Sequence, residues 1–304
     1  MATVLVTGAS GFLGSHIVET FLEAGYTVAC AVSETSQTWR LDEFVDRLNV
    51  LKMDYSDATE WARIVSAVQP DAVVHAGWQG VKGAERNELF QFDNIKSHVA
   101  LADACVAHGV STFIGLGSQM EYGPKTGRIS EGETASPTTH YGLAKLCSLA
   151  AAEVRCAPPG LRFCWARVFS LMGPKDNGWW LVPSIIKALK SGEVMPFTKG
   201  EQLWDFLHVK DAADAIKALV ESPGSSGVFN LGSGHPVKLR DAIEYIAGRV
   251  NPGIPLPFGA LPYREHQVMH LEADISRLQT LTGWEPVRSL STPFDDTIEY
   301  FLAH

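Results

Sequence analysis

The sequence predicts an α/β fold in which a doubly wound parallel sheet is joined to a smaller C-terminal lobe. Over residues 1–170, short apolar runs bounded by turn residues alternate with segments of helical periodicity, and strands separated by helices form parallel sheets. Beyond residue 170 this alternation loosens, and Gly, Pro, Lys and Trp become frequent. A chain of 304 residues is long enough to bury a large core and to form a cleft between two lobes.

The elements of the large domain follow from where the apolar runs begin and end. Gly25 and Pro70 stop two helical segments, because glycine favours a helix C-terminus and proline cannot continue a helix. We expect strands over Thr3–Thr7, Thr27–Val32, Asn49–Met53, Ala72–Ala76, Thr112–Leu116 and Leu161–Val168, with helices over Phe12–Ala24, Ala58–Val68, Asn94–His108 and Tyr141–Val154.

The rest of the chain divides between the sheet and the lobe. We expect a helix over Val182–Lys190, and short strands over Phe206–Val209 and Val228–Leu231 that rejoin the sheet. Prolines at 252, 255, 257 and 262 set the segment from residue 236 to the end apart. The predicted domains are residues 1–170 together with 206–234, and a substrate-binding lobe made of residues 171–205 and 235–304.

Composition and charge exclude several classes of protein. The net charge of −9 argues against nucleic-acid binding, because a protein without a basic face releases few counterions from phosphates. The opening MATVLVTGASGFLG has no basic segment, and no apolar run reaches about 18 residues. We therefore expect no signal peptide and no membrane span, and place the protein in the cytoplasm.

The cysteines and histidines predict neither a disulfide framework nor a metal site. Five scattered cysteines contain no Cys-x-x-Cys and stand in apolar segments, which is typical of reduced core residues. His266 and His270 have the spacing of a metal-binding pair on a helix, but no further ligands accompany them. We expect no metal.

A glycine-rich loop follows the first predicted strand. Gly8, Gly11 and Gly14 stand between this strand and a helix, where glycine lets the backbone approach a pyrophosphate that is held at the helix N-terminus. This context predicts a dinucleotide-binding Rossmann domain, with Ser10, Phe12 and Leu13 of the loop also at the cofactor. Ligands of such sheets bind outside the carboxyl ends of the strands, so the cleft lies between the sheet and the lobe.

The end of the second strand bears on the choice between NAD(H) and NADP(H). A site for NAD usually carries Asp or Glu there for the ribose 2′-OH, whereas this chain has Ser33, followed by Glu34 and then Arg40. A hydroxyl and an arginine suit a 2′-phosphate, so we favour NADP(H). NAD(H) remains the alternative if Glu34 is displaced by one position or if Arg40 caps a helix. Asp54 is expected to contact adenine or to cap the next helix.

Tyr141 and Lys145 form a candidate catalytic pair at the start of a helix. Residues four apart share a helix face, so the amine can stand beside the phenol. A neighbouring cation favours the phenolate and makes tyrosine usable as an acid–base group near neutral pH. Ser118 can then hold the carbonyl oxygen that accompanies hydride transfer.

With the glycine loop and the order of elements, these residues resemble the extended short-chain dehydrogenase/reductase family, in its branch of nucleotide-sugar epimerases, dehydratases and reductases. The resemblance implies a catalytic triad of Ser118, Tyr141 and Lys145, with Lys145 also on the nicotinamide ribose. We further expect cofactor contacts from Tyr55, Ala76, Gly77, Trp78, Asn94 and Val168. The matching motifs are the loop at 7–14, Asp54, Ala76-Gly77, Asn94, Ser118 with Tyr122-Gly123, Tyr141 and Lys145, residues 166–169, Gly173-Pro174, residues 205–209 with Asp211, and residues 230–232.

Departures from the family narrow the reaction. Similar dehydratases carry Asp and Glu directly after the hydroxyl residue, and this chain has Gln119 and Met120, which do not exchange protons usefully near neutral pH. Glu121 comes one residue later, and on an extended segment it would face away, so we interpret it as structural. The resemblance to dual-function epimerase/reductases implies a Cys and a His at places where this chain has neither. Of the reactions that the family carries out, hydride transfer to or from a sugar carbon is the one that these residues still allow.

Two sugar reactions fit: reduction of a nucleotide-linked 4-keto-6-deoxyhexose, which we favour, and 4-epimerisation with NAD. A reductase of small non-sugar ketones or aldehydes and a non-catalytic NADP(H)-binding regulator are further alternatives. The resemblance suggests a homodimer through the helices at 94–108 and 141–154, whose apolar faces could instead meet the sheet. Arg264 is expected to bind the nucleotide diphosphate, with Lys199 a lesser candidate; the other expected substrate contacts are Gln119, Met120, Phe169, Ser170, Trp180 and Trp204.

Overall fold

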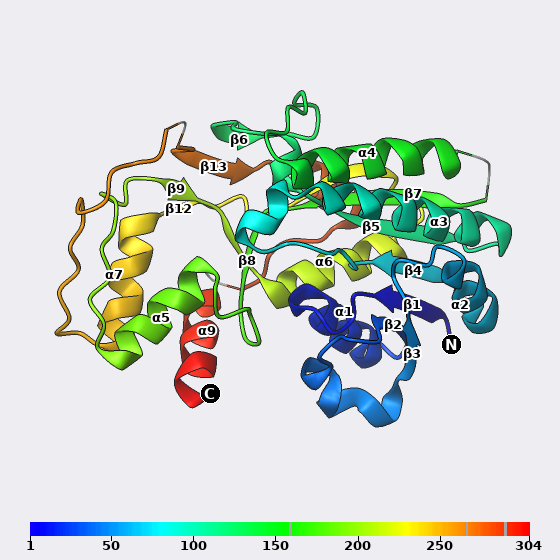
Figure 1. Cartoon of the computed structure of the whole chain (residues 1–304), viewed down its shortest axis with the longest axis horizontal. Helices are drawn as coiled ribbons and strands as arrows, with labels where there is room; N and C mark the ends of the chain where they lie inside the picture. Colours follow the sequence, from blue (N-terminus) through cyan, green and yellow to red (C-terminus); the bar gives the residue numbers. More distant parts are fainter. Residues whose placement is uncertain (158–159, 266, 289–290) are drawn as a thin grey trace.

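Seven parallel strands form the central sheet of the computed structural model, which describes residues 1–157, 160–265, 267–288 and 291–304 (Figure 1). The strand order reverses between β1 and β4, which is the switch point at which doubly wound sheets bind ligands. The predicted fold class is confirmed. In spatial order the strands are β3 (Asn49–Met53), β2 (Thr27–Ser33), β1 (Thr3–Thr7), β4 (Ala72–His75), β5 (Thr112–Ser118), β7 (Arg162–Val168) and β11 (Gly227–Leu231).

Helices cover both faces of this sheet, which explains why its inner strands are mostly apolar along their length. Val4, Leu5 and Val6 of β1 are each at most 1% exposed, because side chains on both sides of the strand are buried. One face carries α1 (Phe12–Glu23) and α6 (Val209–Glu221), and the other carries α2 (Glu60–Val68), α3 (Asp93–Ala107) and α4 (His140–Arg155) (Figure 1).

A third apolar core lies beyond the sheet, in the lobe. Helices α5 (Leu181–Ser191), α7 (Leu239–Val250) and α9 (Thr292–Ala303) surround it with Phe197 and Phe206 (Figure 1). The lobe region also contains β8 (Ser170–Met172) paired with β10 (Phe206–His208), and a sheet of β12 (Val237–Lys238), β9 (Leu203–Trp204), β13 (His270–Ala273) and β6 (Gly127–Ile129).

The expectation that Phe206–Val209 rejoins the main sheet is wrong. The free edge of β7 is taken by β11, with Val228 opposite Trp165, so only the later predicted strand returns. β10 instead pairs with β8 in a separate ribbon. In addition, apolar residues of the segment 270–284, which includes β13 and α8 (Ser276–Thr282), pack on the core of the main sheet, although we assigned this segment to the lobe.

One of the five cysteines departs from the expected core placement. All five are free, and four are buried, but Cys147 is exposed. It lies on α4 between the buried Lys145 and Ser148, at a position that faces away from the sheet. It therefore contributes nothing to the core.

Two further features of the structure concern membrane-spanning helices and metal-binding groups. In the four described ranges, no helix combines the length and apolarity needed to cross a bilayer. Nor do these ranges hold a group of three or more His, Cys, Asp or Glu side chains suited to a metal ion. Of the histidine pair, His270 bonds Glu272, and His266 lies outside the described residues.

Candidate active site

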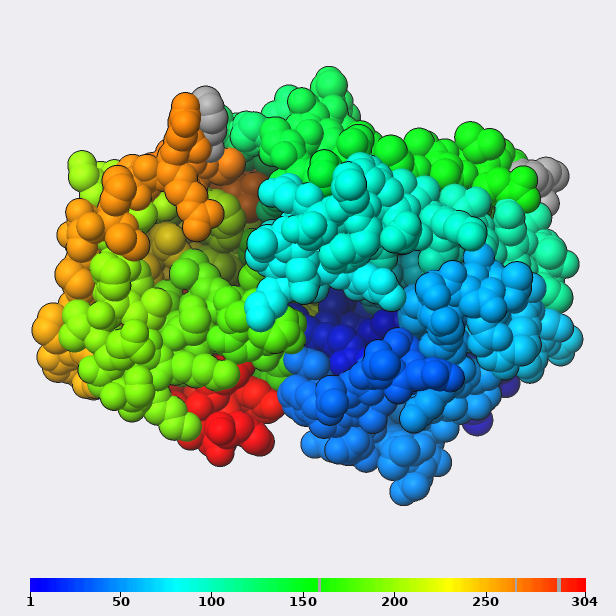
Figure 2. Space-filling view, in the orientation of Figure 1, coloured from blue at the N-terminus to red at the C-terminus, as the bar shows by residue number. Residues whose placement is uncertain are grey.

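The glycine loop, Ala76-Gly77 and Ser118 stand at the carboxyl ends of β1, β4 and β5, which are neighbours in the sheet. Figure 2 shows a hollow on this face of the molecule, with dark-blue N-terminal residues at its floor. The cyan segment that leads from β4 to α3 borders the hollow on one side, and the green segment that leads into α5 borders it on another. The hollow thus lies between the sheet and the lobe, as the sequence predicts.

The glycine loop is packed as a cradle that larger residues would fill. Gly8 has φ +64°, and a Cβ there would lie 2.6 Å from the backbone nitrogen of Gly77. A Cβ on Gly14 would lie 2.1 Å from the carbonyl oxygen of Gly8. Gly11 stands at the N-cap of helix α1 and provides no side-chain cap, so the first N–H groups of the helix remain available to an anion. These features fit the pyrophosphate of a dinucleotide.

Tyr55 and Asn94 lie beside this cradle, around one cavity. The Tyr55 hydroxyl accepts from the Gly8 nitrogen at 3.0 Å and donates to the Ala31 oxygen, while Asn94 bonds both backbone groups of Gln79. The cavity measures about 250 Å³ and is lined by Tyr55, Ser56, Gln79, Asp93, Asn94, Lys96 and Ser97. Two of the predicted cofactor residues are therefore brought together.

The structure excludes one of the two roles expected for Asp54, which is the capping of the next helix. Its carboxylate accepts from the backbone and the hydroxyl of Ser56, which closes a turn and lowers the pKa of the carboxyl group. Helix α2 begins only at Glu60, so Asp54 does not cap it. Contact with adenine stays a prediction.

The guanidinium of Arg40 is engaged within the protein. Arg40 is 8% exposed, in the 3₁₀ segment η1 (Trp39–Arg47). Its guanidinium donates to the carbonyl oxygens of Lys175 and Ser10 and to the side chain of Asn177. The Arg40 guanidinium thus connects the glycine loop to the segment that enters the lobe. This geometry supports neither the binding of a 2′-phosphate by Arg40 nor the capping of a helix. At the end of β2, the Ser33 hydroxyl bonds Thr35.

The three predicted catalytic residues converge. Ser118 ends β5, and its hydroxyl lies near enough to Tyr141 to lower the pKa of the phenol; Tyr141 is 9% exposed on the first turn of α4. Thr139 caps this helix by accepting from the Gly142 nitrogen. The Lys145 amine lies 5.9 Å from the centre of the Tyr141 ring and donates to the Leu116 oxygen at 2.6 Å.

The electrostatics differ from the expectation that Lys145 makes the phenol acidic. Burial raises the pKa of Tyr141 above its ordinary value, and it outweighs the opposing effects of the Ser118 hydrogen bond and the charge of Arg86. Burial also lowers the pKa of Lys145 to about 7. The sequence-based reasoning omitted this desolvation, because burial depends on packing that the motif does not encode.

Glu121 is structural, as expected, but for a different reason. The segment Gln119–Glu121 is a short 3₁₀ turn, η4, and not an extended strand. The turn places the fully buried Glu121 against Arg167 at 2.7 Å, and the carboxylate also accepts from the Ser118 and Trp165 nitrogens. These partners occupy the Glu121 carboxylate, which therefore stabilises the fold and is not available to a substrate.

The expected substrate residues are placed unevenly. Gln119 and Met120 are partly exposed on η4, and Trp180 caps the start of α5. The remaining four are less clearly at the hollow: Trp204 donates to Ser170 at 2.7 Å, Phe169 is buried beside Tyr122, and Arg264 is exposed on the segment before β13. Substrate contact by these residues stays a prediction, and the burial of Phe169 gives it no support.

The sequence analysis missed Arg86 and Gln91. Both lie between β4 and α3, in a segment with the 3₁₀ turns η2 (Gly83–Asn87) and η3 (Leu89–Phe92). Gln91 is fully buried and fixes the segment, and Arg86 stands beside Tyr141. The one available signal was position, since loops after strands at the carboxyl edge carry site residues.

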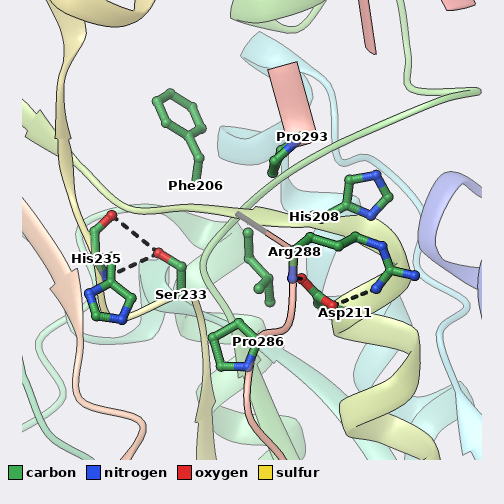
Figure 3. Close-up of a pocket in the computed structure, with 9 residues that line it drawn as sticks. Phe206, His208, Asp211, Ser233, His235, Pro286, Arg288 and Pro293 are labelled. Atoms are coloured by element: carbon green, nitrogen blue, oxygen red, sulfur yellow. Dashed lines mark hydrogen bonds and ion pairs between the residues drawn. The ribbon is translucent and has the colours of Figure 1, made fainter. Parts of the chain in front are cut away.

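A second cavity, of about 300 Å³, lies away from these catalytic residues (Figure 3). It opens between β10, the start of α6 and the residues Pro286, Arg288 and Pro293. Four of its polar side chains are engaged within the protein: Arg288 pairs with Asp211, His208 with Asp296, and Ser233 with Asp205. It offers no reactive group of the predicted set.

Comparison with known proteins agrees with this geometry. Residues 4–232 match the model of the NAD dependent epimerase/dehydratase family. The chain is 24% identical, over 88% of its length and 97% of the relative's, to dTDP-6-deoxy-L-talose 4-dehydrogenase (NAD(+)) of Aggregatibacter actinomycetemcomitans. It is 27% identical, over 93% and 90%, to UDP-glucose 4-epimerase of Corynebacterium glutamicum.

Solved structures show the same fold. The UDP-N-acetylglucosamine 4-epimerase of Methanobrevibacter ruminantium M1, in complex with UDP-N-acetylmuramic acid, superposes with a TM-score of 0.90 at 25% identity, covering 99% of this chain and 98% of that one. The chain belongs to the NAD dependent epimerase/dehydratase family. It is an enzyme that depends on a pyridine nucleotide.

Proposed function

We propose that this enzyme reduces the 4-keto group of a nucleotide-linked 6-deoxyhexose, with Tyr141 as the proton donor. When bound, the nicotinamide supplies the hydride. The observation that carries the proposal is the proximity of the Ser118 hydroxyl to Tyr141 at the carboxyl edge of the sheet, beside the glycine cradle. Ser118 orients the carbonyl oxygen, and Tyr141 gives its proton to that oxygen.

The surroundings of this pair support hydride transfer without elimination of water. Gln119 and Met120 carry no proton-transfer group, and Glu121 is held by Arg167. Trp78 and Trp180 supply apolar surface near Tyr141, which suits a sugar that lacks the 6-hydroxyl group. The relative named as a dehydrogenase of a dTDP-linked deoxysugar supports the same substrate class.

For the cofactor, we propose NADP(H) with NAD(H) as the alternative. The absence of a carboxylate at Ser33 supports NADP(H), whereas the engaged guanidinium of Arg40 weakens the argument. In the binding of either dinucleotide, the residues we assign are those of the cradle, Tyr55 and Asn94, with Lys145 at the nicotinamide ribose.

For the other end of the substrate, we propose that Arg264 binds the diphosphate. Its exposed guanidinium has the planar geometry that suits phosphate oxygens. Arg264→Ala should raise KM for a nucleotide sugar at least tenfold and leave kcat nearly unchanged. An exposed arginine on α2, Arg63, provides the matched control as Arg63→Ala. An unchanged KM in the Arg264 variant would remove nucleotide sugars as substrates and favour a small neutral ketone or aldehyde.

The second candidate is a 4-epimerase that oxidises and re-reduces the sugar with retained NAD(H). The relatives named UDP-glucose 4-epimerase support it. Incubation with a panel of nucleotide-linked 4-keto-6-deoxyhexoses and each reduced cofactor separates the two. Stoichiometric oxidation of the cofactor supports the reductase, and interconversion of sugars without net oxidation supports the epimerase. Cofactor binding without any turnover of sugars or simple ketones would favour the alternative that the protein is a non-catalytic NADP(H)-binding regulator.

Three further assignments rest on sequence alone and remain proposals: the two-domain boundaries, location in the cytoplasm and assembly as a homodimer. Sedimentation of the purified protein tests the last of them. A monomer at micromolar concentration would contradict it.

A further inference from the structure

Arg86 is a cation beside the proposed proton donor that no motif assigned. Its guanidinium carbon lies 5.4 Å from the centre of the Tyr141 ring and 5.0 Å from that of Trp180. Tyr141 belongs to α4, and Trp180 begins α5 of the lobe. Arg86 therefore lies between an aromatic ring on each side of the hollow.

The segment that carries Arg86 is held in place by buried bonds. The Gln91 side chain donates to the carbonyl oxygens of Gly80 and Glu85 and accepts from the Trp78 indole at 2.8 Å. The Arg86 Nε donates to the Val81 oxygen at 2.9 Å, which orients the guanidinium. These hydrogen bonds hold both the turn and the Arg86 side chain, so the position of the guanidinium charge is fixed by the segment itself.

No carboxylate neutralises this charge within the part of the chain that the structure describes, because none of its ion pairs involves Arg86. The side chain is partly buried, so solvent screens it less than a fully exposed one. Its field therefore acts on the groups that it touches, and Tyr141 is the one among them that can ionise.

We propose that Arg86 is a positioning residue that acts through Tyr141: it stabilises the phenolate that remains when the phenol gives up its proton, and fixes the ring against Trp180. The proposal adds a second cation to the pair of Tyr141 and Lys145 and rests on the proposed role of Tyr141. In the reduction, the O–H bond of Tyr141 breaks, its proton goes to the carbonyl oxygen, and the negative charge stays on the phenol.

The groups that face Tyr141 come from four elements. Lys145 lies on the same helix, Arg86 on η2, Ser118 at the end of β5, and Glu121 on η4. Arg86 and the Ser118 hydrogen bond lower the pKa of the phenol, while burial and the charge of Glu121 raise it. Removing Arg86 takes away a lowering contribution, so the pKa of Tyr141 should rise.

The test titrates Tyr141 directly and needs no substrate. Phenolate absorbance is followed from pH 6 to pH 11 in the protein with cofactor bound, and the same curve for the Tyr141→Phe variant is subtracted. Arg86→Gln should move the difference curve upward by about half to one pH unit. Arg86→Lys, which keeps the charge, should move it less than half as far.

Lys82 provides the matched control. It lies one turn earlier in the same segment and contacts the Trp179 ring instead of Tyr141. Lys82→Gln removes one positive charge and should leave the titration of Tyr141 unchanged. If Arg86→Gln does not fold, Arg86→Met, which keeps the aliphatic stem, replaces it as the uncharged variant.

An unchanged titration in the uncharged variant would overturn the proposal, and so would a shift as large in Lys82→Gln as in Arg86→Gln. Because the titration needs no turnover, a wrong sugar or a wrong reaction does not affect it. If a sugar substrate is found and Arg86→Gln raises only KM while the titration stays fixed, Arg86 binds substrate and does not act through Tyr141.

Discussion

The amine of Lys145 lies 3.7 Å from the centre of the Trp78 indole ring, and it donates its hydrogen bond to the Leu116 carbonyl oxygen. The amine is thus buried against an aromatic face with no carboxylate bonded to it, which explains why burial lowers its pKa to about 7. A dinucleotide ribose that bonds Lys145 would give this charge further hydrogen-bond partners.

Replacement of Tyr141 tests the central assignment. Tyr141→Phe removes the hydroxyl that lies near Ser118 and keeps the ring beside Trp78 and Arg86. Because a positioned acid contributes about 10²- to 10⁴-fold, kcat should fall at least a hundredfold. The dissociation constant of the reduced cofactor, measured by fluorescence, should change less than threefold. Activity within a few-fold of the parent would reject Tyr141 as the proton donor.

The buried amine predicts a pH dependence of stability. The pKa of Lys145 is about 7 in the folded protein and near 10.5 when unfolded, so the unfolded chain binds more protons between these values. The free energy of unfolding should therefore rise with pH across this window. The expected contribution is about 2–4 kcal/mol by pH 10.

Urea unfolding of the cofactor-free protein between pH 7 and pH 10 measures this contribution. Lys145→Met fills the same space without a charge and should lack the rise, whereas Lys52→Met, at an exposed position of β3, should keep it. Parallel pH dependence in the parent and in Lys145→Met would show that the amine is not desolvated as the structure indicates.

The ion pair of Glu121 and Arg167 predicts a large cost for removing one partner. Glu121→Ala leaves the guanidinium of Arg167, which is 4% exposed, without its carboxylate, and should reduce the free energy of unfolding by about 3–5 kcal/mol. Replacing both residues by Met should cost clearly less, because no buried charge is then left alone. Chemical denaturation measures all three proteins, and a loss below about 1 kcal/mol in the single variant would contradict this account.

The end of β2 predicts a change in cofactor preference. Ser33→Asp places a carboxylate where it can accept from a ribose 2′-OH and repel a 2′-phosphate, so the ratio of kcat/KM for NADH over NADPH should rise at least tenfold. Arg40→Gln should instead weaken both cofactors to a similar degree, because Arg40 bonds the backbone of Ser10 and Lys175. A selective loss of NADPH in the Arg40 variant would show that this arginine reads the 2′-phosphate after all.

By itself the sequence determined the sheet and the glycine cradle, and it predicted which three residues stand together as the proposed catalytic group. The periodicity of the apolar runs and the helix stops are local signals, and Ser118, Tyr141 and Lys145 are carried by elements whose order fixes where their ends meet. Only the tertiary structure decided what surrounds them. β11, and not β10, occupies the edge of the sheet beside β7. Arg40 donates to backbone oxygens of two segments that are distant along the chain.

The same holds for the charges. Burial shifts the pKa values of Tyr141 and Lys145 and commits Glu121 to Arg167, while the bonds of Gln91 bring Arg86 to the phenol. Desolvation and contacts between distant segments depend on three-dimensional packing, which the spacing of residues along a chain does not specify.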